Sequence, residues 1–263
     1  MRFKAINQVQ KALYSLPPWT FRRLTFTEAA KKYTTPNKLH RYFHTYFRAG
    51  CSSEVKGHRR YFSQERRGFG EDAFHGMWTT IFEEFRPRHC LEIGVYRGQV
   101  ISLWAVLARE RGIPAVVAGV SPFEPVGDSV SEYPSGISYL EDTLSSFRQL
   151  DLPDPLLVKG LSTSGQAAEL FASRRWDLIY IDGSHDLDVV QQDYRNSVRA
   201  LRSGGILVMD DAGIGSGFSP PFFSFIGHPG PSRVARDWAK RELRFLGAVG
   251  DNLVFMKEDE PEA

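Results

Sequence analysis

Acidic residues directly follow two apolar runs of the sequence. Trp176 to Asp186 reads WDLIYIDGSHD and Gly204 to Gly213 reads GGILVMDDAG, so Asp182, Asp210 and Asp211 each follow a β-branched stretch. Such a run is typical of a buried parallel strand that delivers its carboxyl end to a ligand. Three carboxylates at neighbouring strand ends repel one another unless they are protonated or share a cation. Oxygen ligands favour Mg²⁺ or another hard divalent ion over zinc. The alternative is that Asp210 or Asp211 only caps the turn that follows.

A glycine-containing turn follows another apolar run. The segment from Cys90 to Gln99 (CLEIGVYRGQ) places Glu92, Gly94 and Gly98 in the order E-x-G-x-x-x-G. These glycines permit a tight strand-to-helix turn and the close approach of a ligand to the backbone. A helix that begins near Gly98 would offer its free N–H groups there. The G-x-G-x-x-G spacing of a dinucleotide site is absent, and a turn with a purely structural duty is the alternative.

Two histidines lie where a general base could act. His185 comes just after Asp182, on the loop that enters the next helix, and a near-neutral pKa suits the removal of a proton from a hydroxyl. His228, in a later loop, is the second candidate, and Asp182 itself is the third. The simpler alternative for each histidine is a hydrogen bond within its own loop.

The pattern of apolar residues predicts alternating strands and helices, which is typical of a doubly wound parallel α/β sheet. We expect a helix over 72–85, stopped by Pro87. Strands are expected near 89–94, 115–120, 155–159, 177–182 and 205–210, and helices near 98–111, 138–149, 164–173, 187–201 and 231–241. Two short apolar runs around Gly250-Asp251 predict a final antiparallel hairpin. The Gly-, Pro- and Phe-rich stretch between Ala212 and Pro231 has the length of a lid or substrate-binding loop.

Residues 1–70 are expected to form a helical, basic and aromatic extension, and residues 71–263 the main domain. Ten Lys and Arg residues and a single acid, Glu28, precede residue 54, although the net charge of the whole chain is only +2. Such a region is either a solvated helical face or a contact with an anionic partner. The two cysteines, Cys51 and Cys90, cannot form a disulfide framework, and no apolar run could span a bilayer. No signal-peptide pattern is present, so we expect a cytoplasmic setting.

The order of these motifs resembles that of class I S-adenosylmethionine-dependent methyltransferases from about Gly70 to the end of the chain. The segments IDGSHDLDVVQQD and LRSGGILVMDDA are similar to the metal-dependent O-methyltransferase branch, which includes methyltransferase family 24 and the cephalosporin-hydroxylase-like group. That branch acts on small molecules and sugars. The resemblance implies a Rossmann-like, doubly wound, seven-stranded sheet, mostly parallel with an antiparallel C-terminal hairpin.

The resemblance also implies roles for individual residues. Asp182, Asp210 and Asp211 would hold a divalent metal such as Mg²⁺, and His185 would face the cofactor or the substrate. Contacts to S-adenosylmethionine would come from Glu92, Gly94, Tyr96, Gly98, Ser121, Ser162 and Asp182. Ser121 stands where relatives commonly have an acid that binds the cofactor ribose, and Glu124 is the other candidate for that contact. Ser162 could equally cap the helix that follows it.

We therefore expect an S-adenosylmethionine-dependent O-methyltransferase that uses a divalent metal to activate a hydroxyl of a small molecule or sugar. The alternative is a non-catalytic binding or scaffold protein with a degenerate methyltransferase fold, which the serine at position 121 favours. Nucleic acid is a disfavoured substrate, because the fourth strand is followed by Asp182-Gly183-Ser184 and not by a [DNS]-P-P-[YF] motif. A peripheral membrane contact through the basic N-terminus and assembly into a homo-oligomer both stay open.

Overall fold

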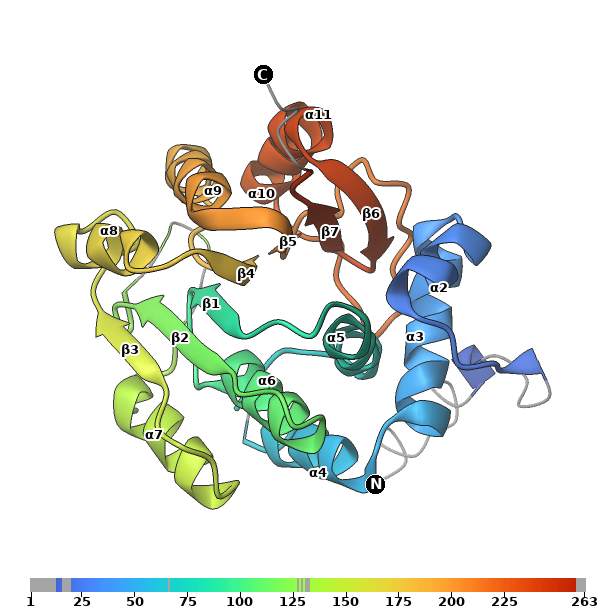
Figure 1. The fold of residues 1–263 in the computed structure, drawn as a ribbon, viewed down its shortest axis with the longest axis horizontal. Helices are drawn as coiled ribbons and strands as arrows, with labels where there is room; N and C mark the ends of the chain where they lie inside the picture. The colour runs from blue at the N-terminus through green and yellow to red at the C-terminus, as the bar shows by residue number, and fades with distance from the viewer. Residues whose placement is uncertain are drawn as a thin grey trace.

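Seven strands form a single sheet in the order β3-β2-β1-β4-β5-β7-β6 in the computed structural model of the protein (Figure 1). The structure describes residues 13–15, 20–65, 67–126, 128, 130 and 133–258. The strands are β1 (His89–Ile93), β2 (Val116–Ser121), β3 (Leu156–Lys159), β4 (Trp176–Ile181), β5 (Leu201–Met209), β6 (Arg244–Val249) and β7 (Asn252–Met256). Strands β1 to β5 pair in parallel, and β7 runs antiparallel to both β5 and β6. The predicted Rossmann-like sheet and its C-terminal hairpin are thus confirmed.

Helices cover both faces of this sheet (Figure 1). The helices on one side are α3 (Pro36–Gly50), α4 (Ser53–Phe62), α5 (Asp72–Phe85), α6 (Gln99–Glu110) and α7 (Tyr139–Gln149), and those on the other are α8 (Gly165–Ala172), α9 (Leu187–Ala200) and α10 (Pro229–Val234). Alternate strand residues enter different cores: Leu178 and Tyr180 pack with Trp104, whereas Ile179 and Ile181 pack against the α8–α9 side. Burial on both faces explains why the strands read as continuous apolar runs.

The expected elements lie close to the observed ones, with two exceptions. Strand β5 begins at Leu201 and not near residue 205, because Trp176 pairs with Leu201 and the register then shifts before Leu178 pairs with Ile206. The single helix expected over 231–241 is divided into α10, a π-helical turn at Ala235–Ala239 and α11 (Lys240–Glu242). Neither the bulge nor the π turn has a signal in the apolar spacing.

The N-terminal helices share a core with the sheet. Helix α3 packs against α5 and β6, and α2 (Phe26–Lys32) also contacts β6. The aromatic side chains of α3, among them Tyr42 and Phe43, are buried in the same cluster as Trp78 of α5. The predicted boundary near residue 70 falls between α4 and α5, and the division into an extension and a main domain stays a prediction.

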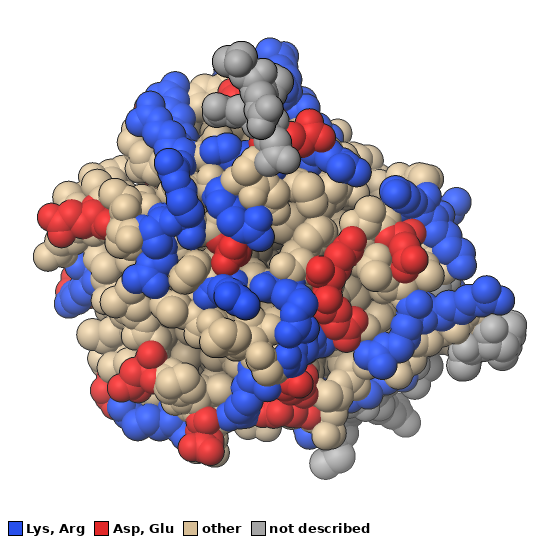
Figure 2. Space-filling model, viewed as in Figure 1, with Lys and Arg blue, Asp and Glu red and all other residues tan. Residues whose placement is uncertain are grey.

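On the described surface, basic and acidic side chains lie side by side. On the face shown in Figure 2, basic side chains are interspersed with acidic ones, so no broad single-sign field covers that face. Several of the basic residues are engaged locally: Arg23 pairs with Glu83, and Arg41 donates to the carbonyl of Tyr14. Arg2, Lys4 and Lys11 lie outside the described residues. Within the described part of the chain, no helix has the length and apolar character needed to cross a membrane.

Candidate active site

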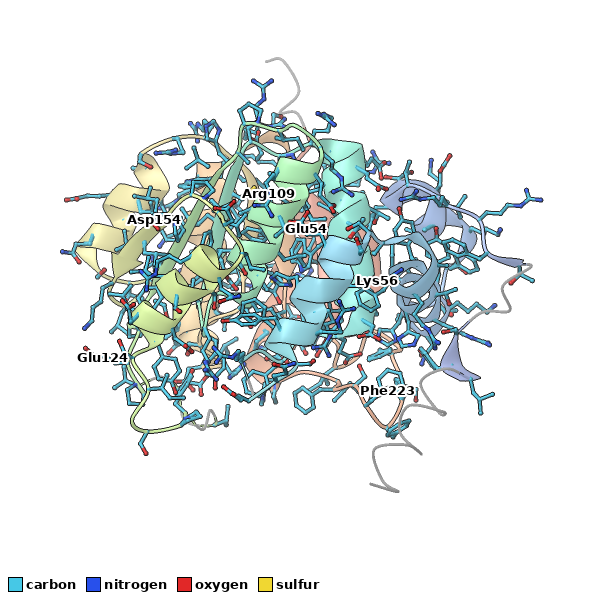
Figure 3. All side chains as sticks on the ribbon, turned by 90° about the horizontal axis from the view of Figure 1, so that it is seen from below. Glu54, Lys56, Arg109, Glu124, Asp154 and Phe223 are labelled. Atoms are coloured by element: carbon cyan, nitrogen blue, oxygen red, sulfur yellow. The ribbon has the colours of Figure 1, made fainter. Side chains whose placement is uncertain are left out.

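A cavity of about 800 Å³ opens at the carboxyl ends of the parallel strands. This volume lies in the range of roughly 300–1,000 Å³ that is typical of small-molecule sites. The ends of β1, β2, β4 and β5 form its floor, and the loops after β2 and before α10 form its sides. Glu124 and Phe223, which belong to those two loops, lie along the same edge of the molecule in Figure 3. The position agrees with the rule that open α/β sheets bind ligands at their carboxyl edge.

The turn after β1 brings the backbone of two strand ends into direct contact. Gly94 adopts a φ of +98°, and a Cβ there would lie 1.9 Å from the carbonyl oxygen of Asp182. Gly98 caps α6 with a φ of +82°, and its nearest neighbour would be Thr143. Gly94 lines the cavity, whereas Gly98 is not among the lining residues and forms the start of α6. Only glycine fits at position 94, because both the conformation and the space exclude a side chain.

The three predicted aspartates meet at the floor of the cavity. Asp182, Asp210 and Asp211 each offer a carboxylate oxygen, and these oxygens lie within 4.8 Å of one another. Burial, reinforced by the charge of Asp210, raises the pKa of Asp182 well above its usual value. Burial and the charge of Asp211 also raise the pKa of Asp210 to about 6. All the ligand atoms offered by the three aspartates are oxygens, and these carboxyls ionise reluctantly unless a positive charge is near them. Both properties fit a site for a hard divalent cation.

Other acidic groups of the cavity extend this cluster. Burial, with the charge of Asp210, raises the pKa of Glu92 to about 8, and the Oε2 atom of Glu92 has no hydrogen-bond partner among the described residues. Sequence reasoning missed Asp251 and Glu71, which also line the cavity. The pKa of Asp251 is raised well above its usual value by burial and by the charges of Asp210 and Asp211. In the sequence the Gly250-Asp251 pair predicts only a hairpin, but in the structure it also brings a buried carboxyl to the site.

His185 is held between two carboxylates. Its Nε2 lies 2.7 Å from Oδ2 of Asp211, and its Nδ1 lies 2.5 Å from Oδ2 of Asp128. Burial lowers the pKa of His185, but the hydrogen bonds and charges of Asp211 and Asp128 outweigh it, so the pKa is raised. The predicted second histidine, His228, is adjacent, with its ring centroid 3.9 Å from that of His185. Asp128 had no signal in the sequence, since it lies in an irregular loop.

The remaining predicted contacts lie around the rim and wall. Ser121 is almost fully buried at the end of β2 and lines the cavity, as do Tyr96 and Ser162. Glu124 also lines it, but its carboxylate forms an ion pair of 2.6 Å with Lys159. The helix cap proposed as an alternative for Ser162 is made by Ser164, which accepts a hydrogen bond from the backbone of α8. Ser162 lines the cavity, and its hydroxyl is also near Asp193 of α9.

The loop before α10 rests on the N-terminal helices. Ser219 exchanges hydrogen bonds with the side chain of Asn37, at the start of α3. The ring of Phe223, labelled in Figure 3, lies 5.3 Å from that of Tyr14 and 5.6 Å from that of His44. Aromatic side chains thus form one wall of the cavity, at the junction of this loop with the N-terminal region.

Asp193, a buried residue of α9, gives a prediction about stability. Burial raises its pKa to about 6, although Ser162 opposes the shift. A carboxyl whose pKa is higher in the folded than in the unfolded chain destabilises the fold as pH rises from about 4 to about 6, and the penalty then persists. Asp193→Asn should therefore stabilise the protein at pH 8 by on the order of 2 kcal/mol, and much less at pH 4.

Thermal unfolding of both proteins at the two pH values checks this prediction. Asp188→Asn, on the exposed side of the same helix, is the matched control and should show no such difference between the two pH values. An equal gain from Asp193→Asn at pH 4 and pH 8 would contradict the inferred ionisation.

Comparisons with known proteins agree with this geometry. Residues 91–212 match a family model described as a methyltransferase domain. A putative caffeoyl-CoA O-methyltransferase from Staphylococcus aureus is similar in structure, with a TM-score of 0.56 and 14% identity over 84% of this chain and 99% of the other. The SAH-bound methyltransferase PaMTH1 of Podospora anserina has a TM-score of 0.54 and 13% identity, over 80% and 89% of the two chains. Curated protein sequences give no match. At these identities the structural likeness establishes the fold.

Proposed function

We propose that this chain is a class I methyltransferase that methylates a hydroxyl of a small molecule or sugar, with S-adenosylmethionine as donor and a divalent metal as activator. Its sheet order and the match of residues 91–212 to a methyltransferase domain support this proposal. The observation that carries this proposal is the convergence of Asp182, Asp210 and Asp211 beside the glycine turn at Gly94. A cofactor at that turn and a metal at the aspartates would share one cavity.

The cofactor contacts follow from the turn. We assign them to Glu92, Gly94, Tyr96, Ser121, Ser162 and Asp182, with Gly98 shaping the start of α6. Glu92 supports this assignment, because its buried Oε2, which has no partner within the described part of the chain, would gain a hydrogen bond from a polar group of the ligand. When bound, S-adenosylmethionine supplies an electrophilic methyl group. The residues of this chain then have only to orient it toward the aspartates.

The ribose contact can be tested by two substitutions. Ser121 is buried beside the cavity, whereas Glu124 is already paired with Lys159, so we assign the contact to Ser121. Ser121→Ala should weaken the binding of S-adenosylhomocysteine about five- to tenfold, the value of one hydrogen bond of about 1 kcal/mol. Glu124→Gln should leave the affinity nearly unchanged. Titration calorimetry of both variants measures this, and the reverse order would move the contact to Glu124.

Proton removal is assigned to the histidine at the floor of the cavity. A divalent cation held by Asp182, Asp210 and Asp211 would lower the pKa of an acceptor hydroxyl and orient it. His185 lies against Asp211 and is oriented by Asp128. A cation on the Asp211 carboxylate would release Nε2 of His185 from that hydrogen bond, and we assign the removal of the proton to this nitrogen. His228 and Asp182 are the alternatives for this role.

The acceptor would enter beside the aromatic wall. Phe222, Phe223 and Phe225 come from the loop before α10, and Phe69 and Phe74 from the segment that begins α5. Aromatic faces suit the apolar face of a sugar as well as a phenol, which is why the acceptor class includes both. The N-terminal helices hold this wall in place through α3, and we propose that they help to cover the acceptor.

Titration calorimetry and a transfer assay test the proposed function together. We expect S-adenosylmethionine to bind with and without Mg²⁺, and labelled methyl groups to pass to members of a panel of sugars and phenols. Transfer should require Mg²⁺ and stop when a chelator is added. If S-adenosylmethionine binds under neither condition, the enzyme hypothesis is wrong and a non-catalytic scaffold is the better account.

A further inference from the structure

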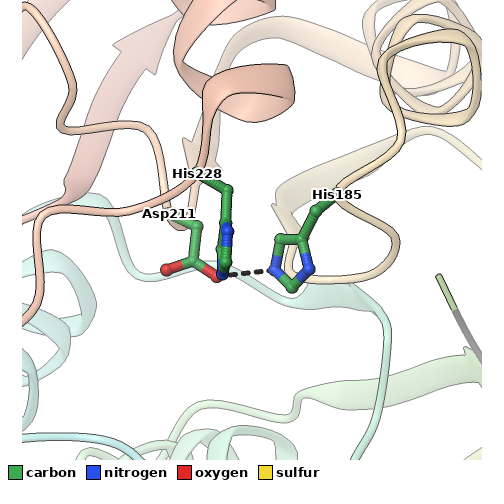
Figure 4. A group of neighbouring side chains, drawn as sticks. All are labelled: His185, Asp211 and His228. Carbon is green, nitrogen blue, oxygen red and sulfur yellow. Dashed lines mark hydrogen bonds and ion pairs between the residues drawn. The ribbon is translucent and has the colours of Figure 1, made fainter. Parts of the chain in front are cut away.

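A second group of metal-ligating side chains lies next to the three aspartates. His185, Asp211 and His228 each offer one ligand atom, and these atoms lie within 4.8 Å of one another. They come from the loop after β4, the end of β5 and the residue that precedes α10, and Figure 4 shows the three side chains together, with a dashed line for the contact between His185 and Asp211. Two imidazoles and one carboxylate form a different donor set from the three aspartates. Imidazole suits zinc, cobalt and nickel, whereas Mg²⁺ prefers oxygen.

The ring of His185 is oriented for ligation through Nε2. Oδ2 of Asp128 accepts a hydrogen bond from the backbone N–H of His185 at 2.8 Å and also contacts Nδ1 of its ring. The Asp128 side chain is fully buried. Metal-binding histidines commonly donate their other ring N–H to a carboxylate, which fixes the tautomer and strengthens the ligand. Asp128 therefore plays the part of this supporting carboxylate.

His228 is fixed to the same strand end by its backbone. Its N–H donates to the carbonyl of Asp211 at 2.8 Å, and Ser232 Oγ donates to the same carbonyl at 3.3 Å. A Cβ on Gly227 would lie 2.2 Å from that oxygen, so the loop can approach only with glycine there. Asp211 itself has a φ of +52°, a conformation that costs a non-glycine residue about 1–2 kcal/mol. Such strain is typically retained where a functional arrangement requires it.

The closeness of the two rings also favours a shared ligand. Their centroids are 3.9 Å apart, and the ligand atoms of both rings lie within 4.8 Å of each other and of the Asp211 carboxylate, so one ion could contact all three side chains. The carboxylate of Asp211, with two oxygens, can serve this group and the three aspartates together.

We propose that His185, Asp211 and His228 form a separate site for a borderline divalent transition-metal ion such as Zn²⁺ or Co²⁺. The site shares Asp211 with the proposed Mg²⁺ ligands but does not depend on methyl transfer. Where the function proposed above holds, a metal on Nε2 of His185 occupies the lone pair that would accept the proton. Zn²⁺ should then inhibit methyl transfer even when Mg²⁺ is saturating.

The experiment uses full-length, chelator-treated protein titrated with Co²⁺ and with Zn²⁺ in excess Mg²⁺. We expect one equivalent of Co²⁺ to bind with the visible absorption of an imidazole-ligated ion. His228→Ala should remove that absorption and weaken Zn²⁺ binding, and Asp128→Asn should weaken it by about 10- to 100-fold. His89→Gln is the matched control, because His89 lies at the opposite end of β1. Circular dichroism without metal establishes that each variant is folded.

Two results would overturn the proposal. One is Co²⁺ absorption and Zn²⁺ affinity in folded His228→Ala that equal those of the parent protein. The other is the absence of any Co²⁺ binding when Mg²⁺ is in excess. Asp182→Asn separates this site from the proposed function, since it should lose Mg²⁺-dependent methyl transfer but keep the Co²⁺ absorption. A protein that binds Co²⁺ at His228 yet methylates nothing would leave this inference standing and refute only the function.

Discussion

Asp182→Asn is expected to abolish Mg²⁺-dependent methyl transfer while leaving the metal-free protein at least as stable as before. Burial holds the pKa of Asp182 well above its usual value, so the folded chain without a cation favours the protonated carboxyl. Asparagine has nearly the shape of that neutral form and carries no charge, so the substitution removes a repulsion from Asp210 and does not create one. The loss of a metal ligand should cost on the order of a thousandfold in rate, about 4 kcal/mol of activation free energy.

Three measurements check this prediction together. The transition temperature in chelator should be unchanged or higher in Asp182→Asn. The added stability conferred by Mg²⁺, about 2.7 kcal/mol when the ion is at a hundred times its Kd, should disappear. Methyl transfer to the identified acceptor should fall to background. Asp188→Asn, which removes a nearby exposed carboxylate outside the cavity, should change none of the three. If Asp182→Asn keeps the Mg²⁺ stabilisation, the three aspartates are not the metal ligands.

The elements that build the floor of the site could be predicted because their signals are local. Each central strand is buried on both faces and reads as an apolar run, and the acid that follows it marks the strand end. Parallel pairing then places those ends at one edge of the sheet, so Glu92, Asp182 and Asp210 could be brought together without a structure. The final hairpin was predicted from its Gly-Asp turn, and β7 does run antiparallel to β5.

The rest of the site depends on contacts between distant segments and has no local signal. Asp251 reaches the cavity only because β7 is inserted between β5 and β6, and its neighbour Asn252 then donates to Asp210. Asp128 comes from a loop with no periodicity, and its role is visible only beside His185. The proximity of His228 to His185 requires the whole loop after β5 to fold back onto Asp211. The apolar pattern of a strand does not predict that the loop after it folds back in this way.

Gly94→Ala should have the largest effect of any single methyl group added near the site. The new Cβ would lie 1.9 Å from the carbonyl oxygen of Asp182 and 2.5 Å from Cα of Gly183. Both are backbone atoms, which cannot move aside as the end of a flexible side chain can. The φ of +98° adds strain for any L-residue. The end of β4 must therefore move away from the turn, which separates the proposed cofactor contacts from Asp182. We expect a loss of stability of about 3 kcal/mol or more and a loss of cofactor affinity of about a hundredfold.

Gly112→Ala is the matched control, because it separates the cost of a positive φ from the cost of a steric clash. Gly112 also has a positive φ, +58°, but a Cβ there would meet nothing within 4 Å. Alanine at 112 should cost only about 1 kcal/mol of stability and leave the binding of S-adenosylhomocysteine unchanged. Urea unfolding and titration calorimetry measure both quantities at a temperature where each variant is folded.

Two outcomes would contradict this prediction. Equal losses of stability in the two variants would mean that the ends of β1 and β4 can separate freely. Normal cofactor affinity in Gly94→Ala would show that this turn is not where the cofactor binds. The close approach at Gly94 thus holds the turn after β1 against the end of β4, so the proposed cofactor turn lies directly beside Asp182, a proposed metal ligand.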